Sequence, residues 1–79
     1  MEATEELWDL YWTHIENSKF SLIAAQLLEE EAKKETDERS LKDYYRRQKR
    51  HIRASKKHLR QAKRIRRTID RIERKANGG

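Results

Sequence analysis

The sequence of 79 residues contains no cysteine and no proline, and its two glycines are the last two residues. Without cysteine the chain has neither disulfides nor thiolate metal ligands, an absence compatible with a reducing compartment. Without proline, and without glycine before Gly78, no residue in the first 77 strongly interrupts a helix. These absences together predict helix along nearly the whole chain.

Hydrophobic residues are scarce too, at 34% of the chain, and no apolar run approaches the ~18 residues of a membrane span. Residues 1–6 are acidic and lack the basic start of a secretory signal. We therefore expect an intracellular protein, cytoplasmic or nuclear (in a host cell if viral), with no membrane partner. A chain this small without disulfides is expected to gain stability by oligomerisation. The composition alone would suit disorder, but the periodic apolar positions argue against it.

Charged residues make up 43% of the chain, and their signs are segregated. Residues 1–38 hold 11 acids and 3 bases, whereas residues 39–79 hold 17 bases and 3 acids. Between Tyr44 and Ile69 there are twelve Lys and Arg residues and no acid. Such asymmetry predicts a polyanionic partner for the basic half.

Apolar residues recur at alternating spacings of three and four in both halves, as on one face of a helix. The first ladder comprises Trp8, Tyr11, Ile15, Ser18, Leu22, Ala25, Glu29 and Ala32, broadened by Leu7, His14 and Leu28. The second comprises Leu41, Tyr45, Gln48, Ile52, Ser55, Leu59, Ala62, Ile65, Ile69, Ile72 and Ala76, widened by Tyr44, His51 and His58. We expect one domain with helices over about 4–35 and 41–76, a turn over about 36–40 and a flexible end at 77–79.

The turn and the helix ends follow from polar residues that can cap helices. Thr4 is the expected N-cap of the first helix, Thr36 and Asp37 can cap the second, and Ser40 with Asp43 forms a weak capping box. Asn17 and the serine after it leave open a kink or a break in the first helix.

Folding the chain at residues 37–38 matches apolar partners in size. Trp8 comes beside Ile65 and Ile69, Ile15 beside Leu59, and Leu22 beside Ile52 and Ser55. We therefore predict an all-α fold, an antiparallel helical hairpin resembling a coiled coil. An unbroken helical rod through residue 75 is the alternative.

Residues 20–28 are apolar nearly all round the predicted helix, and a helix of this kind is buried on every side. One face can pack inside the hairpin, which leaves Phe20, Ile23 and Leu27 without a partner. We predict that these three residues join two hairpins into a homodimer with four helices.

The most regular feature of the sequence is a row of nine cations at alternating spacings of four and three. Its members are Arg46, Arg50, Arg53, Lys57, Arg60, Arg64, Arg67, Arg71 and Arg74. We call this row the arginine line; on a helix it occupies one face and is roughly 42 Å long. The lysine column, on its flank, comprises Lys42, Lys49, Lys56 and Lys63.

Unmixed positive charge at this spacing destabilises an isolated helix, so we expect it to serve binding. Guanidinium groups hold phosphate oxygens through paired hydrogen bonds, and Lys49, Lys56 and Lys63 would add a looser electrostatic flank. Few uncharged side chains share this face, so we expect little sequence preference. We predict nucleic-acid binding, with duplex RNA favoured and DNA as the alternative. The competing hypothesis is an interaction module or inhibitor that docks its basic face on an acidic protein.

Little in the sequence supports a metal, cofactor, catalytic or base-stacking site. His51 and His58 are seven residues apart, too far for a zinc-binding pair on one helix, so neither a metal nor a cofactor is expected. No nucleophile–base arrangement or Gly-rich phosphate loop is present, so the chain is expected neither to be an enzyme nor to bind a small-molecule substrate. Trp8 and Tyr11 are better explained as packing residues than as platforms for bases, whereas the place of Trp12 is left open, with the edge of the interface as one alternative.

In layout, an N-terminal helix followed by a longer basic helix in a dimeric four-helix assembly, residues 4–76 resemble the nodaviral RNA-silencing suppressors. The resemblance is one of architecture without a diagnostic motif, and the family's short third helix has no counterpart after Ala76. It implies a viral protein that lays basic helices along double-stranded RNA and suppresses RNA silencing.

Overall fold

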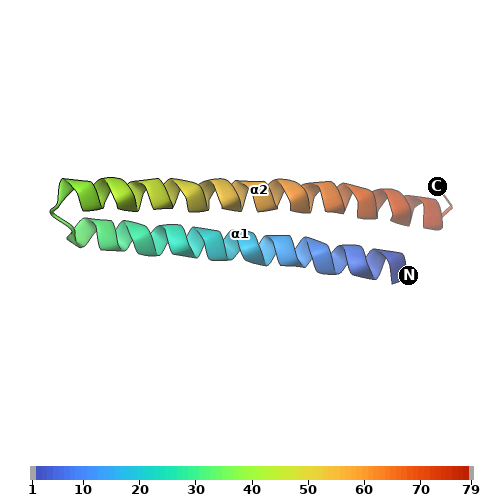
Figure 1. The fold of residues 1–79 in the computed structure, drawn as a ribbon. Coiled ribbons are helices and arrows are strands. Elements are labelled where there is room, and N and C mark those ends of the chain that lie inside the picture. Colours follow the sequence, from blue (N-terminus) through green and yellow to red (C-terminus); the bar gives the residue numbers. More distant parts are fainter. Residues whose placement is uncertain (1, 79) are drawn as a thin grey trace.

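The computed structural model describes residues 2–78, and its side chains from Thr4 onward. Two helices, α1 (Glu2–Lys34) and α2 (Glu38–Ala76), lie side by side and run in opposite directions (Figure 1). Both ends of the chain therefore lie at the same end of the molecule. The predicted all-α hairpin is confirmed, and the unbroken rod is excluded. Of the end expected to be flexible, Gly79 lies outside the described residues.

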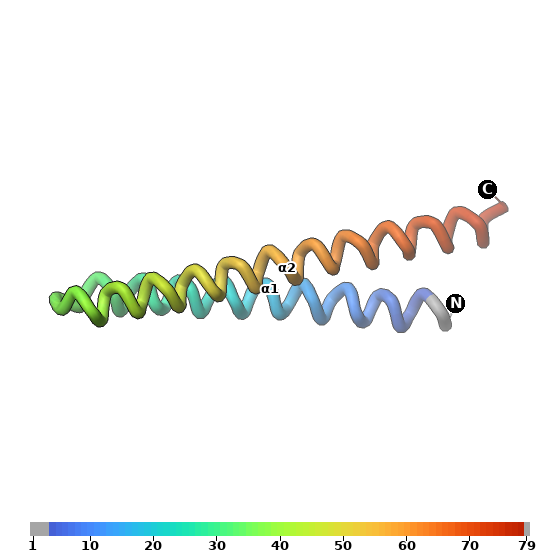
Figure 2. The backbone as a smooth tube through the Cα atoms, turned by 45° about the horizontal axis from the view of Figure 1, so that its top comes forward, coloured from blue at the N-terminus to red at the C-terminus, as the bar shows by residue number. Residues whose placement is uncertain are grey.

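The hairpin is a narrow rod that measures 62 × 14 × 12 Å. Its radius of gyration is 18.0 Å, whereas a compact domain of this length would have about 12 Å. The tube view shows the two helices crossing at a shallow angle rather than running strictly parallel (Figure 2). Each helix therefore meets one neighbour and leaves most of its circumference uncovered.

Three residues, 35–37, reverse the chain. One carboxylate oxygen of Glu35 accepts hydrogen bonds from the backbone N–H groups of Thr36 and Asp37, both at 3.0 Å. Asp37 is the N-cap of α2, and its carboxylate accepts from the backbone N–H of Ser40 at 3.2 Å. Since Asp37 takes this role, α2 begins about three residues before the expected start, and Ser40 lies inside the helix together with Asp43.

Of the other helix ends, the start of α1 differs from the predicted one, whereas the two C-terminal ends agree with the prediction to within one residue. Thr4, the expected cap, lies inside α1, which also passes Asn17 without a break. α2 ends at Ala76, as predicted, and its C-cap is Asn77, whose backbone N–H donates to the carbonyl of Glu73 at 3.0 Å. Gly78 then has φ of 77°, a conformation that glycine adopts without steric cost.

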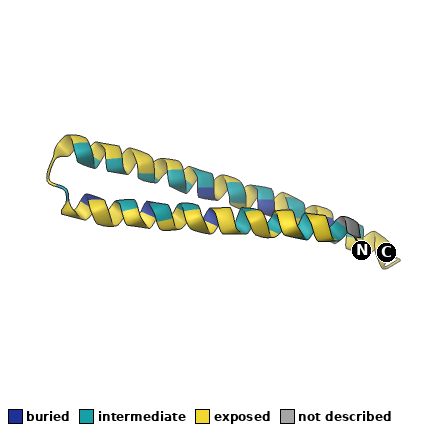
Figure 3. Ribbon diagram, turned by 60° about the horizontal axis from the view of Figure 1, so that its bottom comes forward, coloured by how far each residue is buried: buried dark blue, intermediate teal, exposed yellow. Residues whose placement is uncertain are grey.

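The seam between the helices is built mainly from small side chains that recur every seven residues. Its fully buried members are Ser18, Ala25 and Ala32 of α1 and Ser55, Ala62 and Ile69 of α2. In Figure 3 the buried and half-buried residues follow the facing sides of the helices, and exposed residues cover the rest. Of the described side chains, Ile69 is the only large hydrophobic one that is fully buried. The hydrophobic core is therefore very thin.

Two polar pairs cross this seam. The hydroxyl oxygens of Ser18 and Ser55 lie 2.8 Å apart, and both residues are buried. One turn away, the Nδ1 atoms of His14 and His58 lie 2.9 Å apart, so one ring donates a hydrogen to the other. Among the described residues, no buried side-chain nitrogen or oxygen lacks a hydrogen-bond partner. The polar side chains described in the seam therefore find their hydrogen-bond partners within the hairpin.

The seam keeps one heptad column of each predicted apolar ladder, with Ser18, Ala25 and Ala32 on α1 and Ser55, Ala62 and Ile69 on α2, and leaves part of the other column exposed. Leu22, Tyr45 and Leu59, expected inside, are 44%, 51% and 39% exposed. Ser55 meets Ser18 rather than Leu22, a difference of one helical turn. The columns expected to broaden the ladders complete the seam with half-buried residues: Leu7, His14 and Leu28 on α1, and Tyr44, His51 and His58 on α2. Ile65 and Ile72, which the predicted ladder already includes, are half-buried as well. The prediction is therefore wrong at Leu22, Tyr45 and Leu59, because polar and small residues meet across the seam in matched pairs. Trp8, Ile15 and Ile52, of the same columns, are half-buried.

Candidate nucleic-acid interface

The arginine line lies on the side of α2 that faces away from α1. The seam residues of α2 recur at positions 41, 48, 55, 62 and 69, and the line occupies the positions roughly half a helical turn from them. All nine side chains of the line are exposed. Closing the hairpin therefore leaves the whole line in water.

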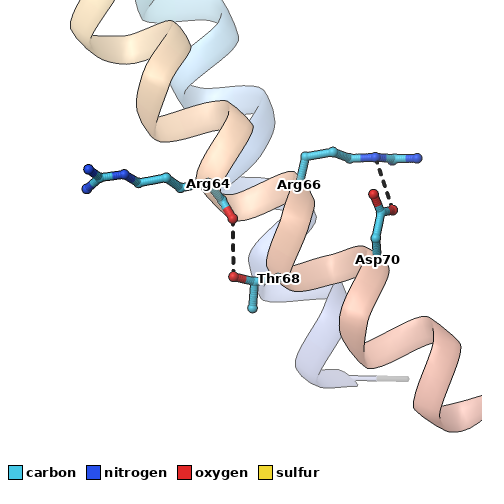
Figure 4. A network of polar contacts seen from close by, with 4 residues as sticks. All are labelled: Arg64, Arg66, Thr68 and Asp70. Atoms are coloured by element: carbon cyan, nitrogen blue, oxygen red, sulfur yellow. Dashed lines mark hydrogen bonds and ion pairs between the residues drawn. The ribbon is translucent and has the colours of Figure 1, made fainter.

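No acid among the described side chains forms an ion pair with this line. Each ion pair among the described side chains joins two residues of the same helix: Glu31–Lys34 at 3.8 Å, Asp43–Arg47 at 3.1 Å and Asp70–Arg66 at 3.4 Å. None of these six residues belongs to the line. Figure 4 shows Arg66 reaching Asp70 on one side of α2 while Arg64, a member of the line, extends on the other. Asp43 and Asp70 of the basic helix thus pair with arginines outside the line.

The lysine column lies beside the line and is exposed as well. Lys49, Lys56 and Lys63 are all on the surface, one heptad apart, and Asp70 ends the column. On its other flank the line is bordered by Arg47, which is engaged by Asp43. The lysines widen the basic surface on one side only.

Stacked cations of this kind repel one another, because side chains three and four residues apart on a helix are neighbours. A duplex carries about one negative charge per 1.7 Å of its axis. Along the roughly 42 Å of the line it would present about 25 phosphates, of which one side faces the helix. A polyanion of regular spacing therefore relieves the repulsion along the whole line.

The aromatic side chains near the open end of the hairpin are engaged with one another and with one arginine. The guanidinium carbon of Arg66 lies 4.6 Å from the centroid of the Trp8 ring. Tyr11 makes edge contacts with Trp8 at 5.5 Å and with Trp12 at 5.1 Å between ring centroids. Trp8 and Tyr11 are half-buried, as expected of packing residues, whereas Trp12 is 54% exposed. Sequence reasoning missed the Trp8–Arg66 contact, although folding at residues 37–38 sets the two residues opposite each other.

The three residues expected at a dimer interface lie on the outer side of α1. Phe20, Ile23 and Leu27 are 65%, 50% and 61% exposed. The hairpin itself therefore leaves them uncovered.

No three His, Asp or Glu side chains among the described residues gather into a metal-binding group. His14 and His58 meet across the seam, whereas His51 is a full heptad from His58. Within residues 2–78, neither helix has a stretch long and apolar enough to cross a membrane.

Comparison of the chain with protein-family models, curated proteins and solved structures finds no match. The resemblance to the nodaviral suppressors stays a prediction that rests on layout.

Proposed function

We propose that this protein binds duplex nucleic acid, with RNA favoured over DNA, by laying the arginine line of α2 along the phosphates. One observation carries the proposal: nine cations of one helix face share the solvent side, and none pairs with an acid among the described side chains. A surface that only confers solubility normally mixes both signs at this spacing.

The chemistry of the line suits phosphates more than bases. Eight of its nine members are arginines, whose planar guanidinium groups form paired hydrogen bonds with phosphate oxygens. Phosphate contacts fix the position of a protein on a duplex but carry no sequence information. The protein is therefore a reader of backbone and shape.

Duplex RNA is favoured because its recognition runs mostly through shape, phosphates and 2′-hydroxyl groups, without base edges. A straight helix laid across the wide, shallow minor groove of A-form RNA can reach phosphates on both of its sides. The layout shared with the nodaviral suppressors points the same way, and suppression of RNA silencing is the role it would imply.

A gel-shift panel tests this proposal with single- and double-stranded RNA and DNA of one fixed length at 50 and 200 mM salt. Each phosphate neutralised contributes to a linear fall of log affinity with log salt, so about six contacts predict roughly a thousandfold loss over this range. Duplexes should bind more tightly than single strands, and RNA more tightly than DNA.

Binding that hardly changes between the two salt concentrations would contradict the proposal. Absence of binding to every nucleic acid, together with a complex formed on an acidic protein, would favour the interaction module instead.

A further inference from the structure

The hairpin leaves many of its large hydrophobic side chains in water. Among the described residues, eight are exposed: Leu10, Trp12, Phe20, Leu22, Ile23, Leu27, Tyr45 and Leu59. Six of the eight belong to α1, although α2 is the longer helix. Because only one large hydrophobic side chain is buried in the described core, we expect another molecule to cover the exposed hydrophobic residues of α1.

One row of α1 faces directly away from the seam, and we call it the outer stripe. It comprises Asp9, Thr13, Glu16, Phe20, Ile23, Leu27, Glu30 and Lys34, all of them exposed. Phe20, Ile23 and Leu27 make its centre apolar, whereas the residues on either side of this centre include three acids and one lysine. The acids repel phosphates, so this face does not suit a second stretch of nucleic acid.

We propose that the outer stripe packs antiparallel against the outer stripe of a second copy, and that this dimer holds two separate duplexes together. The first part stands on the stripe alone. The second part also rests on the proposed binding of duplexes by α2.

The sequence of the stripe is complementary to itself when the two copies run in opposite directions. With the two-fold axis between Ser21 and Leu22, Phe20 of one copy meets Ile23 of the other. The same axis places Asp9 opposite Lys34, an attractive pair of opposite charges. Each of these pairs forms twice, once on each side of the axis.

The remaining positions of the stripe agree with this arrangement. Around the same axis, Thr13 meets Glu30, and Glu16 meets Leu27, so no two acids oppose each other. A parallel pair in register would instead set each acid against its own copy, and like charges at such short range are destabilising. Charge thus selects the antiparallel pairing.

The position of the stripe determines where the two arginine lines end up. The stripe faces away from the seam on α1, and the line faces away from the seam on α2, so they lie on opposite sides of the hairpin. Packing two stripes together produces a layer of four helices with α2 at both outer edges. The two arginine lines then point in opposite directions, and one straight duplex can contact only one of them.

The orientation of the dimer can be measured without nucleic acid. Because the chain has no cysteine, Lys33→Cys gives a single site for a spin label just outside the stripe. In the antiparallel dimer Lys33 faces position 10 of the partner, so the two labels lie roughly 35 Å apart along the helix axis. A distance of about 10–15 Å, or no dimer distance at micromolar protein, would overturn the pairing.

The joining of two duplexes is tested by capturing a fluorescent RNA duplex on beads that carry a different, immobilised duplex. The unmodified protein should retain the fluorescent duplex on the beads. Phe20→Gln, Ile23→Gln and Leu27→Gln together should keep the affinity and salt dependence for one duplex but lose at least ten times in capture. Tyr45→Gln with Leu59→Gln, two exposed apolar residues of α2 outside both the stripe and the arginine line, should leave capture unchanged.

Each other outcome has a definite meaning. Full capture by the triple variant, or equal loss in the control, would overturn the role of the stripe. If no duplex binds at all, the proposed function and the joining of duplexes both fail, while the spin-label distance still decides the dimer. Should the triple variant lose its helical circular dichroism, the distance measured in the Lys33→Cys protein decides the pairing.

Discussion

At Ser18 and Ser55 the two helices meet through hydroxyl groups, at positions where a coiled coil would normally carry branched apolar side chains. The apolar period predicts that each helix has an inner stripe, but it favours the columns with the largest apolar residues. In the structure, polar side chains of α1 instead face polar side chains of α2. Ser18 with Ser55 and His14 with His58 lie opposite each other once the chain folds at residues 35–37, which is a signal that apolar counting overlooks.

The serine pair makes a quantitative prediction for stability. Ser18→Ala or Ser55→Ala alone leaves a buried hydroxyl without its partner, which costs about 1–3 kcal/mol in the free energy of unfolding. The double variant removes both hydroxyls, so it should be more stable than the sum of the single losses implies. Chemical denaturation followed by circular dichroism measures all four proteins.

Strict additivity of the two changes would mean that the hydroxyls do not interact and that the helices pack in another register. The neighbouring column offers a control. Leu22→Ala, at the position predicted to meet Ser55 but found 44% exposed, should cost less than a buried leucine would.

At the scale of the elements, the sequence located the turn and named Asp37 among the residues able to cap α2, but it did not single Asp37 out. Residues 35–40 include several side chains able to cap a helix, and local preference does not choose among them. The observed choice depends on Glu35, whose carboxylate accepts from two successive backbone N–H groups and holds Asp37 in place.

Removing the cap tests this assignment. Asp37→Ala should lower the free energy of unfolding by about 1 kcal/mol, because the backbone N–H of Ser40 loses its acceptor. Asp43→Ala removes only an exposed pair with Arg47 and should cost about 0.3–0.5 kcal/mol. A larger loss for Asp43 than for Asp37 would place the start of the helix at Ser40, as the capping box predicts.

The arginine line has a cost for α2 that the free protein should reveal. Replacing Arg53, Lys57 and Arg60 by Gln removes several like-charge neighbours, each worth about 0.2–0.5 kcal/mol. At low salt the variant should therefore melt at a higher temperature than the unmodified protein, and the difference should shrink in about 1 M salt.

Arg47→Gln with Arg66→Gln provides the opposite case, since both residues pair with acids of α2. That variant should not gain stability. If neutralising the line also fails to raise the melting temperature at low salt, its cations do not repel each other appreciably. That result would contradict a cost of the line that binding must offset.

At the scale of the whole molecule, one feature of the sequence predicted both the hairpin and the exposure of the arginine line: each helix has a single packing stripe. Two helices that pack through one stripe each must leave their opposite faces in solvent. The extent of the exposed apolar surface was less predictable, because Leu22, Tyr45 and Leu59 had been assigned to the core. The molecule is slender because it consists of two helices that pack along a single thin seam.

The most direct test of the central claim compares two variants of equal net charge. Arg53→Glu with Arg60→Glu alters the line, whereas Lys19→Glu with Lys33→Glu alters exposed lysines of α1 by the same four units of charge. Both should keep their helical circular dichroism. The affinity of each for one RNA duplex is measured at 100 mM salt.

The line variant should bind about a hundredfold more weakly than the unmodified protein, because contacts with phosphate become repulsion. The α1 variant should bind within about threefold of it, since its altered residues lie on the other helix, away from the line. Equal weakening of both variants would show that net charge alone drives binding and would contradict a site on α2.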